Sequence, residues 1–115
     1  MLFKTIIASV KPDHTDKVVD AAKKAGATGA TILSGRGTGC HEAKTFFGLT
    51  LEPQSDIIMM LIEEHMVQGI LDAIAEAGEF SKPGTGMAFV LPVEQVVGLD
   101  SQIDLIKARI QDPSF

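Results

Sequence analysis

The sequence predicts an α+β fold in which a strand–helix–strand unit occurs twice. Residues 5–26 match residues 57–78 when the chain is shifted by 52 residues, and the second part of the match reads VVDAAKKAG in one copy and ILDAIAEAG in the other. Each copy begins with a short apolar run, too short for a helix, and a further apolar run follows its helix. This order is the ferredoxin-like plan βαββαβ, a four-stranded antiparallel sheet with both helices on one face.

The first copy begins with a strand predicted from Ile6 to Val10. Pro12 marks the start of the following helix, because the first turn of a helix does not need its missing N–H. Gly26 marks the end of that helix, since glycine readily takes the left-handed conformation after the last turn. The second strand is expected over Ala30–Gly35. The apolar face of the helix consists of Val18, Ala22 and Ala25.

The second copy repeats this order, with strands predicted over Ile57–Ile62 and Met87–Val97 and with a helix that ends at Gly78. The strands are apolar at nearly every position, which predicts burial of both sheet faces and an oligomer packed sheet to sheet. The apolar face of the second helix consists of Met66, Ile70, Ile74 and Ala77.

The last segment, residues 99–115, is predicted to be a helical tail outside a domain that spans residues 1–98. Ile103, Ile106 and Ile110 lie along one side of such a helix. We expect it to pack on its own subunit or on a neighbouring one. A tail that recruits a partner is the alternative.

Composition excludes several classes of protein. The chain has 115 residues, 45% of them hydrophobic, which suits one domain with a true core. Its net charge of −5 argues against nucleic-acid binding. No apolar run approaches the roughly 18 residues of a membrane span. We expect no secretory signal, and a single cysteine permits no internal disulfide, so we expect a cytoplasmic protein.

Two glycine-rich segments are candidate anion sites, namely GRGTG at Gly35–Gly39 and SKPGTGMAF at Ser81–Phe89. Successive glycines let backbone N–H groups approach an anion closely, and they equally permit tight turns or a bulge. Lys82 would add a positive charge to such a site, and Thr85 a hydroxyl donor.

Cys40, His41 and Glu42 are adjacent and suggest a metal site, but neighbouring residues on a strand point to opposite sides. His14 and His65 fall in polar segments at the helix starts. A nucleophilic cysteine would need a positioned base, and an adjacent histidine rarely provides that geometry. The sequence therefore predicts neither a metal site nor an enzyme.

Several of these segments resemble the PII signal-transduction (nitrogen regulatory P-II) family. The similar residues are KP at Lys11–Pro12, GATGAT at Gly26–Thr31 and KPGTGMAFV at Lys82–Val90, and the resemblance covers roughly residues 1–98. It implies a homotrimer of ferredoxin-like subunits with ATP or ADP in the clefts between them. It also implies a sensor that regulates a membrane transporter, an enzyme or a transcription factor, chiefly through a long T-loop.

The resemblance assigns the site residues by position. Thr31, Leu61 and Ile62 would lie beside the adenine. The remaining nucleotide-binding positions would be Gly37 and Gly39 at the base of the T-loop and Lys82, Gly84, Thr85 and Gly86 in the phosphate-binding B-loop. The loop that contacts a partner would include Cys40, His41, Glu42, Lys44, Phe46 and Phe47.

The chain also departs from the family pattern. Met87 replaces a phosphate-binding lysine, and Glu94, Gln95 and Gly98 stand in the region where the family has arginines. The connection Cys40–Gly48 is shorter than a T-loop and has no tyrosine. Losing charge-assisted contacts of about 1.5–3 kcal/mol each should weaken triphosphate binding.

These departures predict a PII-like branch with a shortened T-loop, whose effector is ATP, ADP, AMP or a cyclic adenine nucleotide. No resident cofactor is expected. The alternative is a trimeric metal-binding protein similar to the CutA group, which shares the fold. That reading needs His14, Cys40, His41 or Glu42 to converge in space.

Overall fold

The computed structural model describes residues 1–37, 44–46, 49–51 and 54–110, with the backbone alone for 44–46 and 49–51. Two short 3₁₀ turns precede the first two helices. The elements in chain order are β1 (Phe3–Val10), η1 (Pro12–His14), α1 (Thr15–Lys24), β2 (Thr31–Arg36), β3 (Lys44–Phe46), β4 (Leu49–Leu51), β5 (Gln54–Glu63), η2 (Glu64–Met66), α2 (Val67–Ala77), β6 (Gly86–Pro92) and α3 (Asp100–Arg109).

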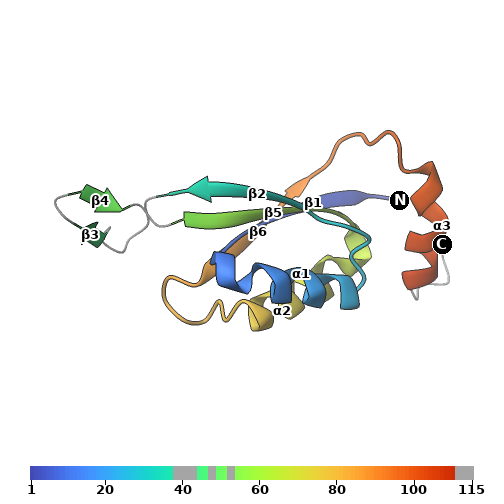
Figure 1. The fold of residues 1–115 in the computed structure, drawn as a ribbon. Coiled ribbons are helices and arrows are strands. Elements are labelled where there is room, and N and C mark those ends of the chain that lie inside the picture. Colours follow the sequence, from blue (N-terminus) through green and yellow to red (C-terminus); the bar gives the residue numbers. More distant parts are fainter. Residues whose placement is uncertain (38–43, 47–48, 52–53, 111–115) are drawn as a thin grey trace.

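The main sheet has the strand order β2-β5-β1-β6, and every neighbouring pair is antiparallel. Helices α1 and α2 both cover one face of this sheet (Figure 1). The α+β, ferredoxin-like fold with two helices on one face is therefore confirmed. The third helix, α3, lies beyond the end of the sheet near the N-terminus, and the β3–β4 pair lies at the opposite end.

The internal repeat of the sequence is also a repeat of the backbone. A shift of 52 residues maps η1 onto η2, and Thr15, the first residue of α1, onto Val67, the first residue of α2. The residues before the two helices have nearly equal dihedral angles, φ −99° and ψ −8° at His14 and φ −97° and ψ −6° at Met66. The predicted register of the repeat is thus confirmed.

Alternation along the strands places the core between the sheet and its two helices. Ile6, Ala8 and Val10 of β1 are buried, as are Ile58 and Met60 of β5, their register partners being Met60 for Ile6 and Ile58 for Ala8. The helices supply the other side, which confirms the predicted apolar faces. Their most buried side chains are Val18, Ala22, Ile70 and Ile74.

The second helix ends at Gly78 as predicted, but the left-handed conformation expected of this glycine is not observed there. Gly26 has φ +122°, as expected for a glycine after a last helical turn. Gly78 has φ −86° and continues the right-handed conformation, and the next residue, Glu79, takes φ +55° instead. In both copies the left-handed residue is the second one after the helix, and it is displaced by one position because α2 has 11 residues and α1 has 10.

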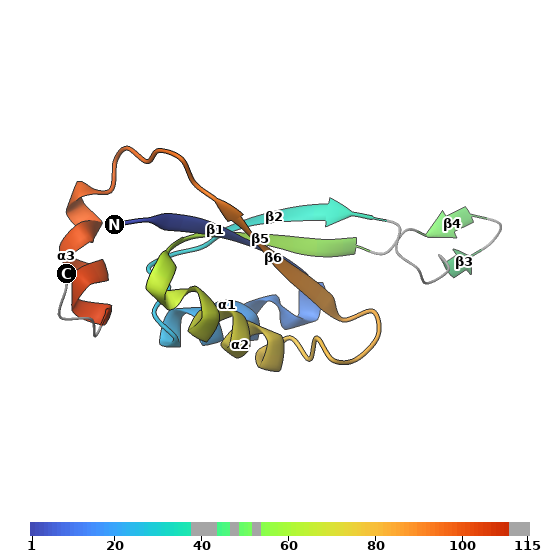
Figure 2. The ribbon, with the colours of Figure 1, turned by 180° about the vertical axis from the view of Figure 1, so that it is seen from behind.

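The last strand of the sheet ends at Pro92, five residues before the predicted end at Val97. Pro92 pairs with Lys4, and β1 begins only one residue earlier, at Phe3, so the neighbouring strand offers no further partners. The chain then arches over the side of the sheet away from α1 and α2 and descends into α3 (Figures 1 and 2).

The connection between β2 and β5 is longer than the predicted segment Cys40–Gly48. It comprises residues 37–53 and includes the antiparallel strand pair β3–β4, in which Thr45 faces Thr50. The expected second strand over Ala30–Gly35 is observed with a shift of one residue, and β5 begins three residues before the expected Ile57. The connection thus contains a short antiparallel strand pair of its own.

Candidate functional site

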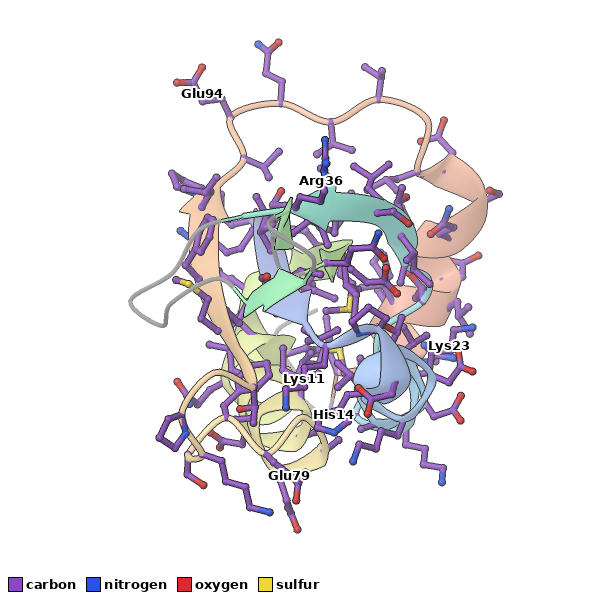
Figure 3. All side chains as sticks on the ribbon, turned by 60° about the vertical axis from the view of Figure 1, so that its left-hand side comes forward. Lys11, His14, Lys23, Arg36, Glu79 and Glu94 are labelled. Atoms are coloured by element: carbon purple, nitrogen blue, oxygen red, sulfur yellow. The ribbon has the colours of Figure 1, made fainter. Side chains whose placement is uncertain are left out.

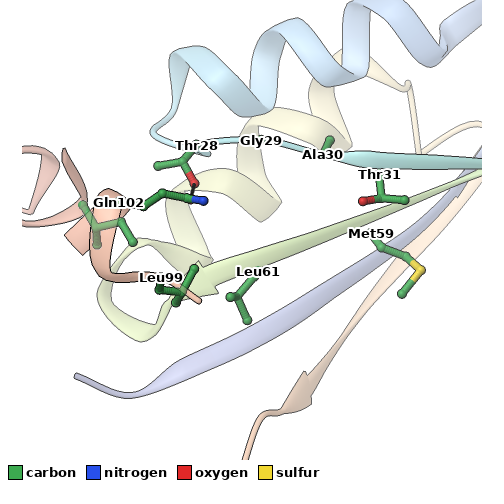
Figure 4. A pocket seen from close by; sticks show the side chains of 9 residues that line it. Thr28, Gly29, Ala30, Thr31, Met59, Leu61, Leu99 and Gln102 are labelled. Carbon is green, nitrogen blue, oxygen red and sulfur yellow. Dashed lines mark hydrogen bonds between the residues drawn. The ribbon is translucent and has the colours of Figure 1, made fainter. Parts of the chain in front are cut away.

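A pocket with a volume of about 290 Å³ lies where β2 begins and β5 ends. Its first wall is the turn Thr28–Thr31, and its floor consists of Met59 and Leu61 of β5 (Figure 4). Thr31 pairs with Met59, and Leu61 lies two residues further along, so these side chains share the sheet face opposite α1 and α2.

The second wall of this pocket belongs to the C-terminal part of the chain and consists of Leu99, Gln102 and Ile106. The Thr28 hydroxyl donates a hydrogen bond of 3.3 Å to the Gln102 side-chain oxygen across the pocket edge (Figure 4). Ile106 is 6% exposed and packs α3 against the turn, as the predicted apolar side of this helix requires. The pocket therefore combines a sheet face, a helix-to-strand turn and α3.

Two of the three residues expected beside an adenine line this pocket, namely Thr31 and Leu61. The side chain of Ile62 points to the other face of β5, where it is 3% exposed in the core. It lines only a much smaller cavity of about 10 Å³ under α3. Adjacent strand residues face opposite sides of a sheet, so Leu61 and Ile62 cannot both reach the pocket with their side chains.

The predicted phosphate loop runs from α2 into β6. Gly84 has φ +74°, a backbone conformation that residues other than glycine rarely adopt. Thr85 is 5% exposed. Its hydroxyl lies 2.7 Å from the Glu79 carbonyl oxygen and 2.9 Å from the Lys82 carbonyl oxygen. Thr85 therefore closes the loop on itself, and its hydroxyl does not face outward to a ligand.

Glu79 is the acidic residue that the basic side chains around this loop contact. Its carboxylate accepts a hydrogen bond of 2.7 Å from the Lys82 ammonium and lies 3.9 Å from that of Lys17 and 3.6 Å from the His14 ring (Figure 3). The Lys82 hydrogen bond and charge, and then the Lys17 charge, hold the pKa of the Glu79 carboxyl below its ordinary value. Lys82, which is the loop's cation, is thus paired within the protein.

Two of the glycines predicted to bind the nucleotide differ in how closely other atoms approach them. A Cβ added at Gly86 would lie 2.6 Å from the Ser9 carbonyl oxygen and 2.6 Å from the Phe80 ring, so the strand approach itself requires glycine. Among the described residues, nothing lies within 4 Å of a Cβ added at Gly37. Close packing within one protomer therefore does not explain the glycine at position 37.

The pocket and the phosphate loop lie far apart within one protomer. The loop ends at Gly86, which pairs with Val10 and through it with Asp56, five residues before Leu61 on β5. At about 3.3 Å per strand residue this separation is about 17 Å along the sheet. Gly37 lies at the same end as the loop, but it follows the opposite edge strand, roughly 14 Å away across three strand spacings.

The remaining predicted residues belong to the β2–β5 connection. Gly39, Cys40, His41, Glu42 and Phe47 lie outside the described residues. Lys44 and Phe46 are the first and last residues of β3, where the backbone pairs with β4. The metal-binding alternative requires His14, Cys40, His41 or Glu42 to converge. His14 lies beside Glu79, and the other three lie outside the described residues, so this alternative stays a prediction.

Within the described residues, one group of three residues could offer ligand atoms to a metal ion, with these atoms within 4.8 Å of one another. The group consists of Glu63, Glu64 and His65. The Glu63 side chain is fully buried and accepts a hydrogen bond of 2.8 Å from the His65 backbone N–H. Its second oxygen lies 2.5 Å from His65 Nδ1. The arrangement is a cap on the turn η2, which accounts for the cluster without a metal.

Sequence reasoning missed Thr28, Met59, Leu99 and Gln102 as lining residues of the pocket. Met59 could have been found, because it lies two positions before Leu61 and therefore on the same strand face. The α3 residues could not, since no pattern in the sequence indicates where a helix that follows a seven-residue loop will dock.

No helix of residues 1–37 or 54–110 is long and apolar enough to cross a membrane. The model of the family "Nitrogen regulatory protein P-II" matches residues 3–102. A Nitrogen regulatory protein P-II of Azospirillum brasilense is 31% identical over 99 residues, which cover 82% of this chain and 88% of that protein.

Two further relatives extend this similarity. The Nitrogen regulatory protein P-II of Microchaete diplosiphon is 31% identical, with the same coverage of both chains. The Nitrogen regulatory protein GlnK2 of Haloferax mediterranei is 27% identical and is covered over 80% of its length. With the ferredoxin-like fold and a match that spans nearly the whole described chain, this protein belongs to the nitrogen regulatory P-II family.

Proposed function

We propose that this protein is a sensor that binds an adenine nucleotide in clefts between its subunits and regulates a partner protein. The observation that carries the proposal is the pocket at the start of β2, because Thr31 and Leu61, assigned to the adenine by family position, line it together. Its volume of about 290 Å³ is at the lower end of the range for small-molecule sites, which suits a base with its sugar.

The phosphates of the nucleotide would then lie outside this pocket, on a loop rich in glycine. Lys82 offers an ammonium, and Gly84 lets the backbone approach an anion without a side chain in the way. This loop is about 17 Å from the pocket along its own sheet, too far for the two parts to meet within one chain. One site built from both parts therefore requires a second copy.

The exposed sheet face supports an assembly of copies. Met59, Met87, Phe89 and Leu91 are between 37% and 58% exposed and share the face opposite α1 and α2, together with the half-buried Ile7. A monomer that exposes such a contiguous apolar face would be prone to association. We propose that this face packs in a homotrimer, which brings the phosphate loop of one subunit to the base pocket of the next.

Residues 37–53 are proposed as the segment that contacts a partner, whether a transporter or an enzyme. Gly37 begins this segment, and the hairpin β3–β4 extends from the end of the sheet (Figure 1). A ligand that contacts Gly37 in one arrangement of the loop but not in another would shift the population of the loop. The protein would act as a cytoplasmic regulator and would not catalyse a reaction.

Calorimetric titration of the purified assembly with ATP, ADP, AMP, cyclic AMP and cyclic di-AMP tests this proposal. We expect saturable binding of at least one of them, and weaker binding in Lys82→Gln. Phe89→Asp should lower the oligomeric mass measured by light scattering, because it places a charge on the apolar face. An absence of binding by all five nucleotides would contradict the proposal.

A further inference from the structure

Helix α3 has a defined position that the general features of the fold do not explain. The family match ends at residue 102, within the first turn of this helix, yet the rest of α3 is docked onto the turn after α1. Ile106 is 6% exposed and Ile110 is 9% exposed. The helix is therefore a part of the protomer and not a free tail.

Arg109 fixes the distal end of α3. Its guanidinium donates hydrogen bonds of 3.0 Å to the carbonyl oxygens of both Gly26 and Ala27. These two carbonyls follow the last turn of α1, where the helix dipole favours a positive charge. Contacts between a cation and carbonyl oxygens are stronger than neutral hydrogen bonds, so this fork holds α3 against the turn that forms the pocket wall.

The docked helix presents Gln102 to the pocket between two apolar residues, Leu99 and Ile106 (Figure 4). The Thr28 hydroxyl donates to the Gln102 oxygen at 3.3 Å, so the oxygen of the carboxamide is turned toward Thr28. The amide nitrogen then remains as a donor at the pocket edge. A donor held in this way recognises a ring nitrogen that accepts a hydrogen bond.

We propose that Gln102 is a specificity-determining residue that donates a hydrogen bond to an acceptor nitrogen of the purine base. This inference rests on the proposed function and adds a base-reading residue to the same site. The α3 side chains line the pocket but leave about 290 Å³ open, which is consistent with a wall around a ligand rather than a plug that replaces it. Met59 and Leu61 supply the apolar floor, on which an aromatic base would pack.

Adenosine 5′-monophosphate and its 1-deaza, 3-deaza and 7-deaza analogues, each of which lacks one acceptor nitrogen, test the inference. In the unmodified protein we expect one of the analogues to bind about tenfold more weakly than the parent. In Gln102→Ala this penalty should disappear, because the donor that the nitrogen would meet is absent. Pairing the base change with the residue change isolates this one interaction.

Matched variants separate base reading from helix docking. Ser101→Ala changes an exposed neighbour on the same helix and should leave every affinity unchanged. Arg109→Ala loosens α3 and should lower the affinity for the parent nucleotide. It should lower the affinity for each analogue by the same factor or by a smaller one. Thr28→Val keeps Gln102 but removes the hydroxyl that orients it, and should reduce the penalty without abolishing it.

Two outcomes overturn the inference in different ways. If every analogue penalty persists unchanged in Gln102→Ala, or if the analogues all bind as tightly as the parent, Gln102 does not read the base and the proposed function stands. If the unmodified protein binds neither adenosine 5′-monophosphate nor any nucleotide of the calorimetric series, the proposed function fails, and Gln102 loses its role with it.

Discussion

The two halves of the repeat share their backbone up to the end of each helix and differ in the turn that follows. After α1, Gly26 takes φ +122° and a short turn leads to β2 and forms the wall of the pocket. After α2, the left-handed residue is Glu79 and a longer loop carries Lys82 and Gly84 into β6. The repeated frame thus positions two turns of different chemistry, and under the proposed function the first would hold the base and the second the phosphates.

The largest effect is expected where the second loop joins the sheet. In Gly86→Ala the new Cβ would meet the Ser9 carbonyl at 2.6 Å, a contact with backbone that cannot move aside easily. We expect the free energy of unfolding, measured with a chemical denaturant, to fall by about 2–3 kcal/mol. Gly37→Ala is the control and should change it by no more than about 0.5 kcal/mol, because no described residue lies within 4 Å of a Cβ added there. Equal losses in both variants would contradict the account.

The next effect compares equivalent positions of the repeat, Glu63 and Lys11. The buried Glu63 carboxylate caps η2 through the His65 N–H, whereas no side chain of the described part caps η1 after Lys11. Glu63→Ala should lower the free energy of unfolding by about 1–2 kcal/mol, since it removes a cap and its hydrogen bond. Lys11→Ala, at an exposed position, should cost less than about 0.5 kcal/mol. Similar values for the two would show that the cap is unimportant.

A smaller and local effect is expected for α3, the helix that docks on the turn after α1 and not on the loop after α2. Arg109→Ala removes both hydrogen bonds to the turn after α1. Local opening of α3 should become easier by about 1–2 kcal/mol, because charge-assisted bonds are lost. Hydrogen exchange should therefore accelerate at residues 100–109 and stay unchanged at residues 58–62. Unchanged protection of α3 would mean that Ile106 and Ile110 alone hold it.

The smallest effect concerns Glu79, whose carboxylate pairs with Lys82 and would compete with a bound anion for it. Glu79→Gln should raise the affinity for ATP about two- to fivefold in calorimetry, because it frees the ammonium from an exposed pair. A weaker affinity in this variant would contradict the competition.

The same residue gives a pH dependence of stability. The pKa of Glu79 is lower in the folded chain than its ordinary value, so its ion pairs stabilise the fold above that ordinary value. The contribution is lost as the pH falls through the folded pKa. The difference in free energy of unfolding between the unmodified protein and Glu79→Gln should be small at pH 7 and vanish in acid. A difference that grows in acid would have the wrong sign.

Much of the fold follows from patterns that repeat in the sequence. Val18, Ala22, Ile70 and Ile74 could be assigned to the core from helical spacing alone, and Gly26 marked the end of α1. Pro12 marked the start of the 3₁₀ turn η1, three residues before α1 begins. The end of the last strand could not be assigned, because it depends on where β1 begins rather than on the apolar run from Met87 to Val97.

The candidate site was predictable only in part. Family position indicated Thr31 and Leu61, and the structure places them in one pocket. The glycine-rich segment predicted Thr85 as a donor to an anion, but in this protomer its hydroxyl closes the loop through two carbonyl oxygens. Loop closure and the docking of α3 depend on contacts between residues distant in sequence, for which residue types alone give no indication.

The most direct test of the central claim mixes two inactive variants. Gly29→Leu fills the base pocket from a position with open space around it, and Lys82→Glu reverses the charge of the exposed cation in the phosphate loop. Each variant alone should lose nucleotide binding. Subunits unfolded together and reassembled in equal amounts should recover binding at roughly a quarter of the clefts, since an intact pocket then meets an intact loop from a neighbour. No recovery in co-assembled mixtures would contradict a site built from two subunits.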